Sequence, residues 1–154
     1  MLGGYSQSGW KVGCQPAGWK GAPLLCPNIP GKPEDEGWKL WVANGPTPGP
    51  IGKSKEVGFA AEFHRATVAG NGLTMYLQGP LEEGKVGIFR SKRVKVGEPW
   101  SKPEPVTGLN HPESKKGDMQ PALNADATRL YFVSDRPGGK GGLDIWTVPT
   151  ILLK

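Results

Sequence analysis

Short apolar segments bounded by turn residues characterise the second half of the chain. Residues 73–77 and 86–89 have the length and composition of two strands joined by a polar connection. The same arrangement recurs at 129–133 and 143–148, where the glycine-rich segment 136–142 makes the connection. Short apolar runs flanked by Gly, Pro, Asn and Asp are typical of β-hairpins. The pattern therefore predicts two hairpins in an all-β fold.

The two hairpins align with each other when Tyr76 is placed over Tyr131, 55 positions later. In this alignment Asn71-Gly72 falls on Asp126-Ala127, and these residue types suit tight turns. A repeat period of this order indicates propellers or solenoids. We therefore expect one supersecondary unit to occur twice. The other aligned positions are Val68 with Leu123, Met75 with Leu130, and, after a two-residue adjustment, Ile88-Phe89 with Ile145-Trp146.

The alignment assigns places to several further residues. Pro121 is expected at the start of its strand, because the first residue need not donate to the ladder. The Pro-rich segment 97–106 is expected to form an edge strand anchored by Trp100 and Val106, since prolines are tolerated on edges. Packing between adjacent sheets is expected of three apolar residues, Leu130, Phe132 and Val148.

The first 58 residues lack such a pattern, because Gly or Pro interrupts them every few positions. We therefore expect residues 1–58 to form a mostly irregular arm and residues 59–154 to form the two repeats, about 62–106 and 117–150. Within the arm, Gly-Trp-Lys occurs three times, at Trp10, Trp19 and Trp38. The tryptophans either present their rings to a glycan or a peptide or pack onto a neighbouring sheet, and their uneven spacing favours packing.

Composition adds little specific chemistry. The net charge of +5 is modest and the basic residues are scattered, so a nucleic-acid partner is not expected. No segment has the ~20 apolar residues of a transmembrane helix, and no signal peptide is visible. Cys14 and Cys26 are either a disulfide or two unrelated thiols, and their spacing matches no zinc or haem signature.

One segment carries a family resemblance. Residues 117–126 (Gly-Asp-Met-Gln-Pro-Ala-Leu-Asn-Ala-Asp), 130–139 (Leu-Tyr-Phe-Val-Ser-Asp-Arg-Pro-Gly-Gly) and 142–146 (Gly-Leu-Asp-Ile-Trp) resemble the TolB-like, WD40-like β-propeller repeat of bacterial exported and envelope proteins. A degenerate copy covers residues 62–90, and Ala127 replaces the usual turn glycine. The resemblance implies four-stranded blades, a location outside the cytoplasm (periplasmic, outer-membrane-associated or extracellular) and a role in protein contacts. Because propellers have ~4 to 8 blades, two repeats make an incomplete ring.

Polar residues around the glycine-rich loop are the candidates for binding. Asp135 and Arg136 lie at the mouth of the hairpin, where they either meet a partner's charges or form a local ion pair of small energy. Asp144 is expected to cap the loop, because it comes one position late for a glycine-rich calcium repeat. No metal or cofactor is therefore expected.

No set of residues predicts catalysis. The sequence spacing of His64 and His111 does not indicate that either lies against a nucleophile and a carboxylate. The favoured hypothesis is a non-catalytic propeller module that binds a protein partner or copies of itself. The alternatives are the propeller portion of an exported peptidase or glycoside hydrolase, and a carbohydrate-binding module that uses the Gly-Trp-Lys tryptophans.

Overall fold

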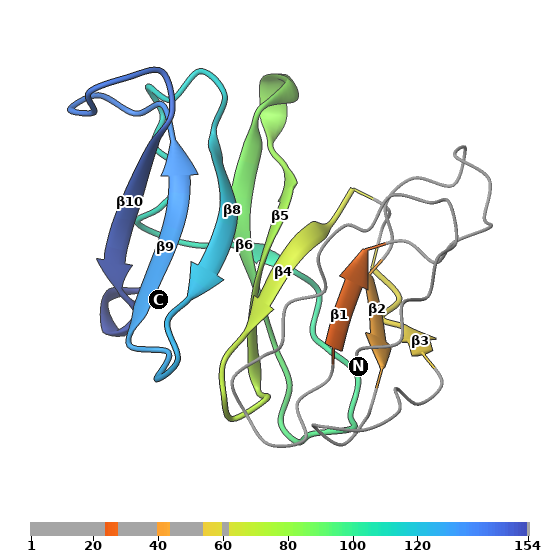
Figure 1. The fold of residues 1–154 in the computed structure, drawn as a ribbon. Coiled ribbons are helices and arrows are strands. Elements are labelled where there is room, and N and C mark those ends of the chain that lie inside the picture. Colours follow the sequence, from red (N-terminus) through yellow and green to blue (C-terminus); the bar gives the residue numbers. More distant parts are fainter. Residues whose placement is uncertain (1–23, 28–39, 44–53, 60–61, 154) are drawn as a thin grey trace, which may run out of the picture.

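The computed structural model describes residues 24–27, 40–43, 54–59 and 62–153, and this part of the chain is all-β, as the sequence predicts. Its strands form three antiparallel sheets that follow one another in chain order (Figure 1). No α-helix occurs among the described residues, which contain 3₁₀ turns at Glu82–Gly84 and Thr150–Leu152. The N-terminal sheet comprises β1 (Leu24–Pro27), β2 (Leu40–Ala43) and β3 (Ser54–Glu56); the middle sheet β4 (His64–Val68), β5 (Thr74–Pro80), β6 (Val86–Lys92) and β7 (Glu104–Pro105); and the C-terminal sheet β8 (Asp118–Leu123), β9 (Arg129–Ser134) and β10 (Asp144–Pro149).

The predicted repeat is visible in the backbone of the middle and C-terminal sheets. Strands β4, β5 and β6 correspond to β8, β9 and β10, and both predicted hairpins, β5–β6 and β9–β10, are present. The turn before each hairpin is closed in the same way. Asn71 accepts a hydrogen bond from Leu73 N at 2.9 Å, and Asp126 accepts one from Thr128 N at 3.0 Å. The 55-residue offset therefore relates equivalent structures, and the predicted turns are confirmed.

Each repeat also has a bulge in its first strand. The register shifts between His64 and Thr67 in β4 and between Met119 and Ala122 in β8. The first residue of each bulge, Arg65 or Gln120, has a positive φ, 50° and 53° respectively. Pro121 lies within the second bulge, between Met119 and Ala122, in the interior of β8. The prediction that Pro121 begins its strand is therefore wrong. Pairing with β9 begins at Asp118. The bulge interrupts the ladder at the proline, which has no backbone N–H to donate, and a proline is therefore tolerated inside the strand.

The two turns differ at one position that costs free energy. Gly72 and Ala127 are equivalent and have φ values of 71° and 57°. A left-handed conformation costs a residue with a Cβ about 1–2 kcal/mol, whereas glycine adopts it freely. We expect Ala127→Gly to raise the free energy of unfolding by about 1 kcal/mol. Urea denaturation measures the change, and the reciprocal variant Gly72→Ala should lower the same quantity. A loss of stability in Ala127→Gly would contradict the assigned strain.

A small sheet forms within the segment that the sequence predicts to be mostly irregular. Three short strands, β1 to β3, pair within residues 24–56, and the sequence pattern did not indicate them. The frequent Gly and Pro limit their length to 3 or 4 residues without preventing pairing. The Pro-rich segment 97–106 does supply an edge strand as predicted, because β7 pairs with β6 at the edge of the middle sheet.

Two apolar clusters hold the sheets together, one on each side of the middle sheet. The first lies between the middle and C-terminal sheets, and its buried members are Tyr76, Ile88, Val106, Leu109, Leu130, Phe132 and Leu153, with Val148 packed against them. The second lies on the opposite side, towards the N-terminal sheet, and its buried members are Leu40, Val68, Met75, Leu77 and Phe89, with Trp100 packed against them. The sheet-packing predictions for Leu130, Phe132 and Val148, and the anchoring roles of Trp100 and Val106, are thus confirmed.

Candidate functional site: a polar network and an uncovered sheet face

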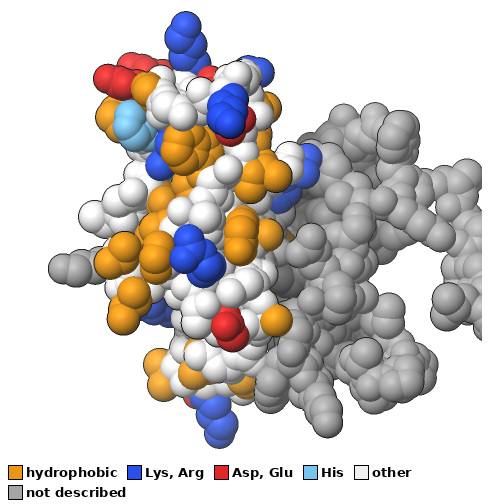
Figure 2. Space-filling model, turned by 60° about the vertical axis from the view of Figure 1, so that its left-hand side comes forward, with side chains coloured by type: hydrophobic (Ala, Val, Ile, Leu, Met, Phe, Trp, Pro, Cys, Tyr) orange, Lys and Arg blue, Asp and Glu red, His pale blue; other side chains and the backbone are white. Residues whose placement is uncertain are grey.

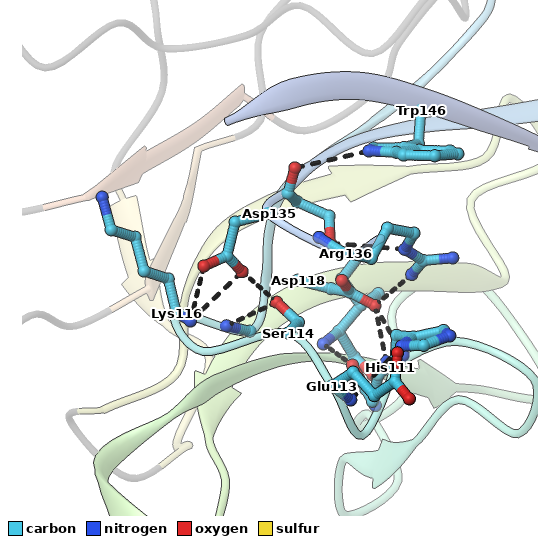
Figure 3. A network of polar contacts seen from close by, with 12 residues as sticks. His111, Glu113, Ser114, Lys116, Asp118, Asp135, Arg136 and Trp146 are labelled. Carbon is cyan, nitrogen blue, oxygen red and sulfur yellow. Dashed lines mark hydrogen bonds and ion pairs between the residues drawn. The ribbon is translucent and has the colours of Figure 1, made fainter. Parts of the chain in front are cut away.

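A buried ion pair lies at the glycine-rich-loop end of the C-terminal sheet (Figure 3). Asp118, at the start of β8, is completely buried, and its Oδ2 accepts a hydrogen bond from Arg136 Nη2 at 2.5 Å. The side chain of Arg136 is only 14% exposed. Its guanidinium lies 4.7 Å from the ring centroid of Phe132 and 5.5 Å from that of Trp146. A carboxylate and two rings therefore surround the cation, which limits its access to water.

The same carboxylate connects the C-terminal sheet to the middle sheet. Asp118 Oδ2 also accepts hydrogen bonds from the amides of Asn110 and His111, at 2.6 and 3.2 Å. The side chain of Asn110 in turn bonds both backbone groups of Ile88 in β6, accepting from the amide at 2.7 Å and donating to the carbonyl at 3.0 Å. The network therefore links β8 and the loop after β9 to the central part of β6.

Asp135 organises the loop that precedes β8. It accepts a hydrogen bond from the hydroxyl of Ser114, and its two oxygens share the amide N–H of Lys116, each at 3.2 Å. Donation by Ser114 is the main cause that lowers the pKa of the Asp135 carboxyl below its ordinary value, and the Lys116 amide adds to the effect. Ser114 is itself buried and accepts from the amide of Gly117 at 2.9 Å. Asp135 thus fixes the entry into β8.

The residues predicted as candidates have distinct positions in this arrangement. Asp135 and Arg136, adjacent in sequence, form their contacts with different partners, Ser114 and Asp118, rather than a local pair. Asp144 caps the glycine-rich loop as expected, because its Oδ2 accepts from the amides of Lys140 and Gly141 at 2.9 and 3.0 Å. Trp10, Trp19, Trp38 and Cys14 lie outside the described residues, as does the side chain of Cys26, whose backbone belongs to β1.

The sequence analysis did not single out Asp118, Asn110 or Ser114 as individual site residues. Asp118 is the second residue of the segment that carries the family resemblance, and this was the available signal for it. Asn110 and Ser114 belong to the connection between the two repeats, which the alignment of hairpins does not cover. Their contacts depend on how that connection returns to the sheets.

The outer face of the C-terminal sheet is a second feature of interest. Leu130 and Phe132 point into the core, so the alternation along β9 places Tyr131 and Val133 on the opposite side. Ile145 of β10 lies beside Val133 in the ladder, and Thr147 lies beside Tyr131. We call these four residues, Tyr131, Val133, Ile145 and Thr147, the outer face. Ile145 is 79% exposed and Tyr131 is 38% exposed.

Several large exposed apolar side chains of the described residues belong to β9, β10 and the segments that flank β10. In Figure 2, which brings the β10 side of Figure 1 forward, hydrophobic side chains are spread over the surface with a few Lys and Arg between them. Scattered exposed apolar residues are normal, whereas a grouped set beside a sheet face marks interaction sites. The exposed members in β10 and its flanks are Leu143, Ile145, Ile151 and Leu152.

A hollow of about 410 Å³ lies between the middle and C-terminal sheets, at the end where the turns before β5 and β9 lie. Arg90 and Lys92 line it from β6, and Asp126 lines it from the turn of the second repeat. The guanidinium of Arg90 already donates to Leu153 O at 3.0 Å. The hollow therefore presents charges of both signs, and one of its two cations is engaged in holding the segment after β10.

In the part of the chain that the structure describes, no three His, Cys, Asp or Glu side chains gather where they would hold a metal ion. Within the described ranges, no helix has the length and apolar character needed to span a bilayer.

Comparisons with known proteins do not assign the chain to a family. No protein-family model matches it, and no curated protein is significantly similar to it.

Proposed function

We propose that the chain is a non-catalytic, β-propeller-type module that makes protein contacts in a bacterial envelope or secreted assembly. The observation that carries the proposal is the outer face of the C-terminal sheet. The middle sheet has apolar clusters on both of its sides, whereas Ile145 and Tyr131 of the C-terminal sheet remain accessible. Exposed apolar surface of this kind on a sheet is a site for a partner.

The arrangement of the sheets supports the propeller-type part of the proposal. Two units related by a 55-residue offset pack face to face, with an apolar cluster between them. The middle unit has four strands, in the order β4-β5-β6-β7. Successive units of four antiparallel strands stacked in this way are how propellers are built. An exported location follows from the resemblance of residues 117–146 and forms part of the same proposal.

The titratable and hydroxyl side chains near the sheets support a non-catalytic role, because they serve structural contacts. Burial lowers the pKa of His64, whose Nε2 lies 3.3 Å from Gln78 Nε2 and whose Nδ1 lies 2.9 Å from Glu62 O. His111 Nδ1 accepts from the amide of Glu113 at 3.3 Å. The hydroxyl of Ser134 accepts from the amide of Arg136 at 3.1 Å. Each of these groups is engaged in holding a local segment.

Site-specific photo-crosslinking in cells that produce the protein tests the proposal. A photoreactive residue at position 145 is expected to give covalent adducts with protein, because the outer face is the contact surface. The matched control is position 94, where Val94 is 89% exposed and belongs to a loop of the middle sheet rather than to the outer face. Adducts at position 145 that are absent or no stronger than those at position 94 would refute the proposed function.

A further inference from the structure

The kind of partner can be inferred by comparing the outer face of the C-terminal sheet with the equivalent face of the middle sheet. Tyr76 and Ile88 of the middle sheet correspond to Tyr131 and Ile145 of the C-terminal sheet. The pairing registers confirm the correspondence, because Ile88 lies beside Gln78 and Ile145 lies beside Val133, 55 positions after Gln78. Tyr76 is 4% exposed and Ile88 is 0% exposed, whereas the equivalent residues are 38% and 79% exposed. The same face is thus covered in one unit and open in the next.

The covered face shows what kind of structure fits. Tyr76 and Ile88 pack in one cluster with Leu130 and Phe132, alternate residues of the central strand of the next sheet. Hydrogen bonds supplement this packing, because side chains of the middle sheet accept from amides of β8. Gln78 Oε1 accepts from the amide of Gln120 at 3.1 Å, a bond that joins the two sheets directly. The natural occupant of this face is therefore an antiparallel sheet of the same repeat.

One guanidinium is also present on each face, although it comes from a different strand. On the covered face, Arg90 donates to the carbonyl of Leu153, in the segment that follows the docked sheet. The residue equivalent to Arg90 is Thr147, and Arg129 donates to its hydroxyl at 3.2 Å. Arg129 is exposed and thus brings a cation to the corresponding place on the open face. The open face retains the means to hold a backbone carbonyl of an incoming sheet.

We propose that the outer face of the C-terminal sheet binds an antiparallel sheet of the same repeat, supplied by a partner polypeptide. The docked sheet presents apolar residues at the positions of Leu130 and Phe132, and it buries Ile145 and Tyr131. Val133 occupies the position that Gln78 has in the middle sheet. On the outer face, apolar contact therefore replaces the hydrogen bond that Gln78 accepts from the amide of Gln120. This inference rests on the proposed function and names the partner of the same surface.

Thiol labelling of an extended chain tests the proposal. Residues 99–153 are repeated after Lys154, so that a further repeat is available at high local concentration, and Cys14 and Cys26 are replaced by Ser in all variants. In the Ile145→Cys variant, we expect labelling in the extended chain to be at least about tenfold slower than in the 154-residue chain. In the Val94→Cys control, the two chains should label at the same rate, because position 94 lies outside the docking face.

A further variant shows that the protection comes from the predicted contact. Replacing the appended counterpart of Phe132 by Glu should restore fast labelling at position 145. Because the repeated residues already fold against the equivalent face of the middle sheet, unchanged labelling of Ile145→Cys in the extended chain overturns the proposal.

Sedimentation of the 154-residue chain tests whether a second copy of the chain occupies the outer face instead. A dimer that Ile145→Glu dissociates and Val94→Glu does not would identify the occupant as a second copy and also overturn the proposal, whereas a monomer is the expected result. Crosslinks to protein at position 145 combined with unchanged labelling would leave the proposed function standing while this inference fails.

Discussion

Replacement of Asp118 by asparagine is expected to lower the free energy of unfolding by about 3 kcal/mol. Asp118 is completely buried, and one of its oxygens accepts from the guanidinium of Arg136 and from two backbone amides. Asparagine removes the negative charge and leaves the largely buried cation of Arg136 without its partner. The cost of an uncompensated buried charge exceeds the modest net value of an ordinary hydrogen bond. Urea denaturation monitored by circular dichroism measures the change.

A double-mutant cycle with Arg136→Met isolates the pair. Each single variant should be strongly destabilised, and the double variant should lose less than the two changes added together, because residues in one ion pair couple. The matched control is Glu83→Gln, since the side chain of Glu83 is 81% exposed and its carboxylate lies 3.8 Å from Lys85 Nζ. This surface pair should contribute less than about 1 kcal/mol. If Asp118→Asn were as mild as Glu83→Gln, the network would not hold the sheets together.

Truncation of Ile88 to alanine is expected to lower the free energy of unfolding by about 2–5 kcal/mol. Ile88 is completely buried in the cluster between the middle and C-terminal sheets, in contact with the next repeat. Removing its side-chain carbons loses apolar burial and leaves a cavity that the packed sheets cannot fully close. Chemical denaturation of the purified chain gives the size of the loss.

The equivalent residue in the second repeat provides the matched comparison. Ile145→Ala makes the same chemical change at the corresponding position, where the side chain is 79% exposed. Its effect on the free energy of unfolding should stay within about 0.5 kcal/mol, as for other surface substitutions. Equal losses in the two variants would show that the outer face of the C-terminal sheet is covered within the chain itself, contrary to the structure.

Features governed by neighbouring residues were predictable. Each hairpin strand was recognised because apolar residues recur between turn residues, and the turns at Asn71-Gly72 and Asp126-Ala127 were recognised because these residue types tolerate such conformations. The capping role of Asp144 belongs to the same class, since it accepts from amides 3 and 4 residues away. Local spacing contains all the information that these features require.

Features that depend on the path of the chain between the repeats were not predictable. Asn110 meets Ile88 across 22 residues, and Asp118 meets Arg136 across 18. Neither separation along the sequence corresponds to the period of a strand or the length of a turn, so no sequence pattern indicates the contact. Pro121 was misplaced for a related reason, because a bulge depends on how two strands pair and not on the composition of one of them.

The sequence by itself determined that this protein is β-rich, where its hairpins turn, and that one unit occurs twice at an offset of 55 residues. These properties follow from side-chain alternation and turn chemistry, which act over a few residues. Only the tertiary structure decided which of two equivalent faces is covered and which is open. Tyr76 is like Tyr131 in sequence, and Ile88 is like Ile145. Their exposures differ because only Tyr76 and Ile88 have a further sheet packed upon them.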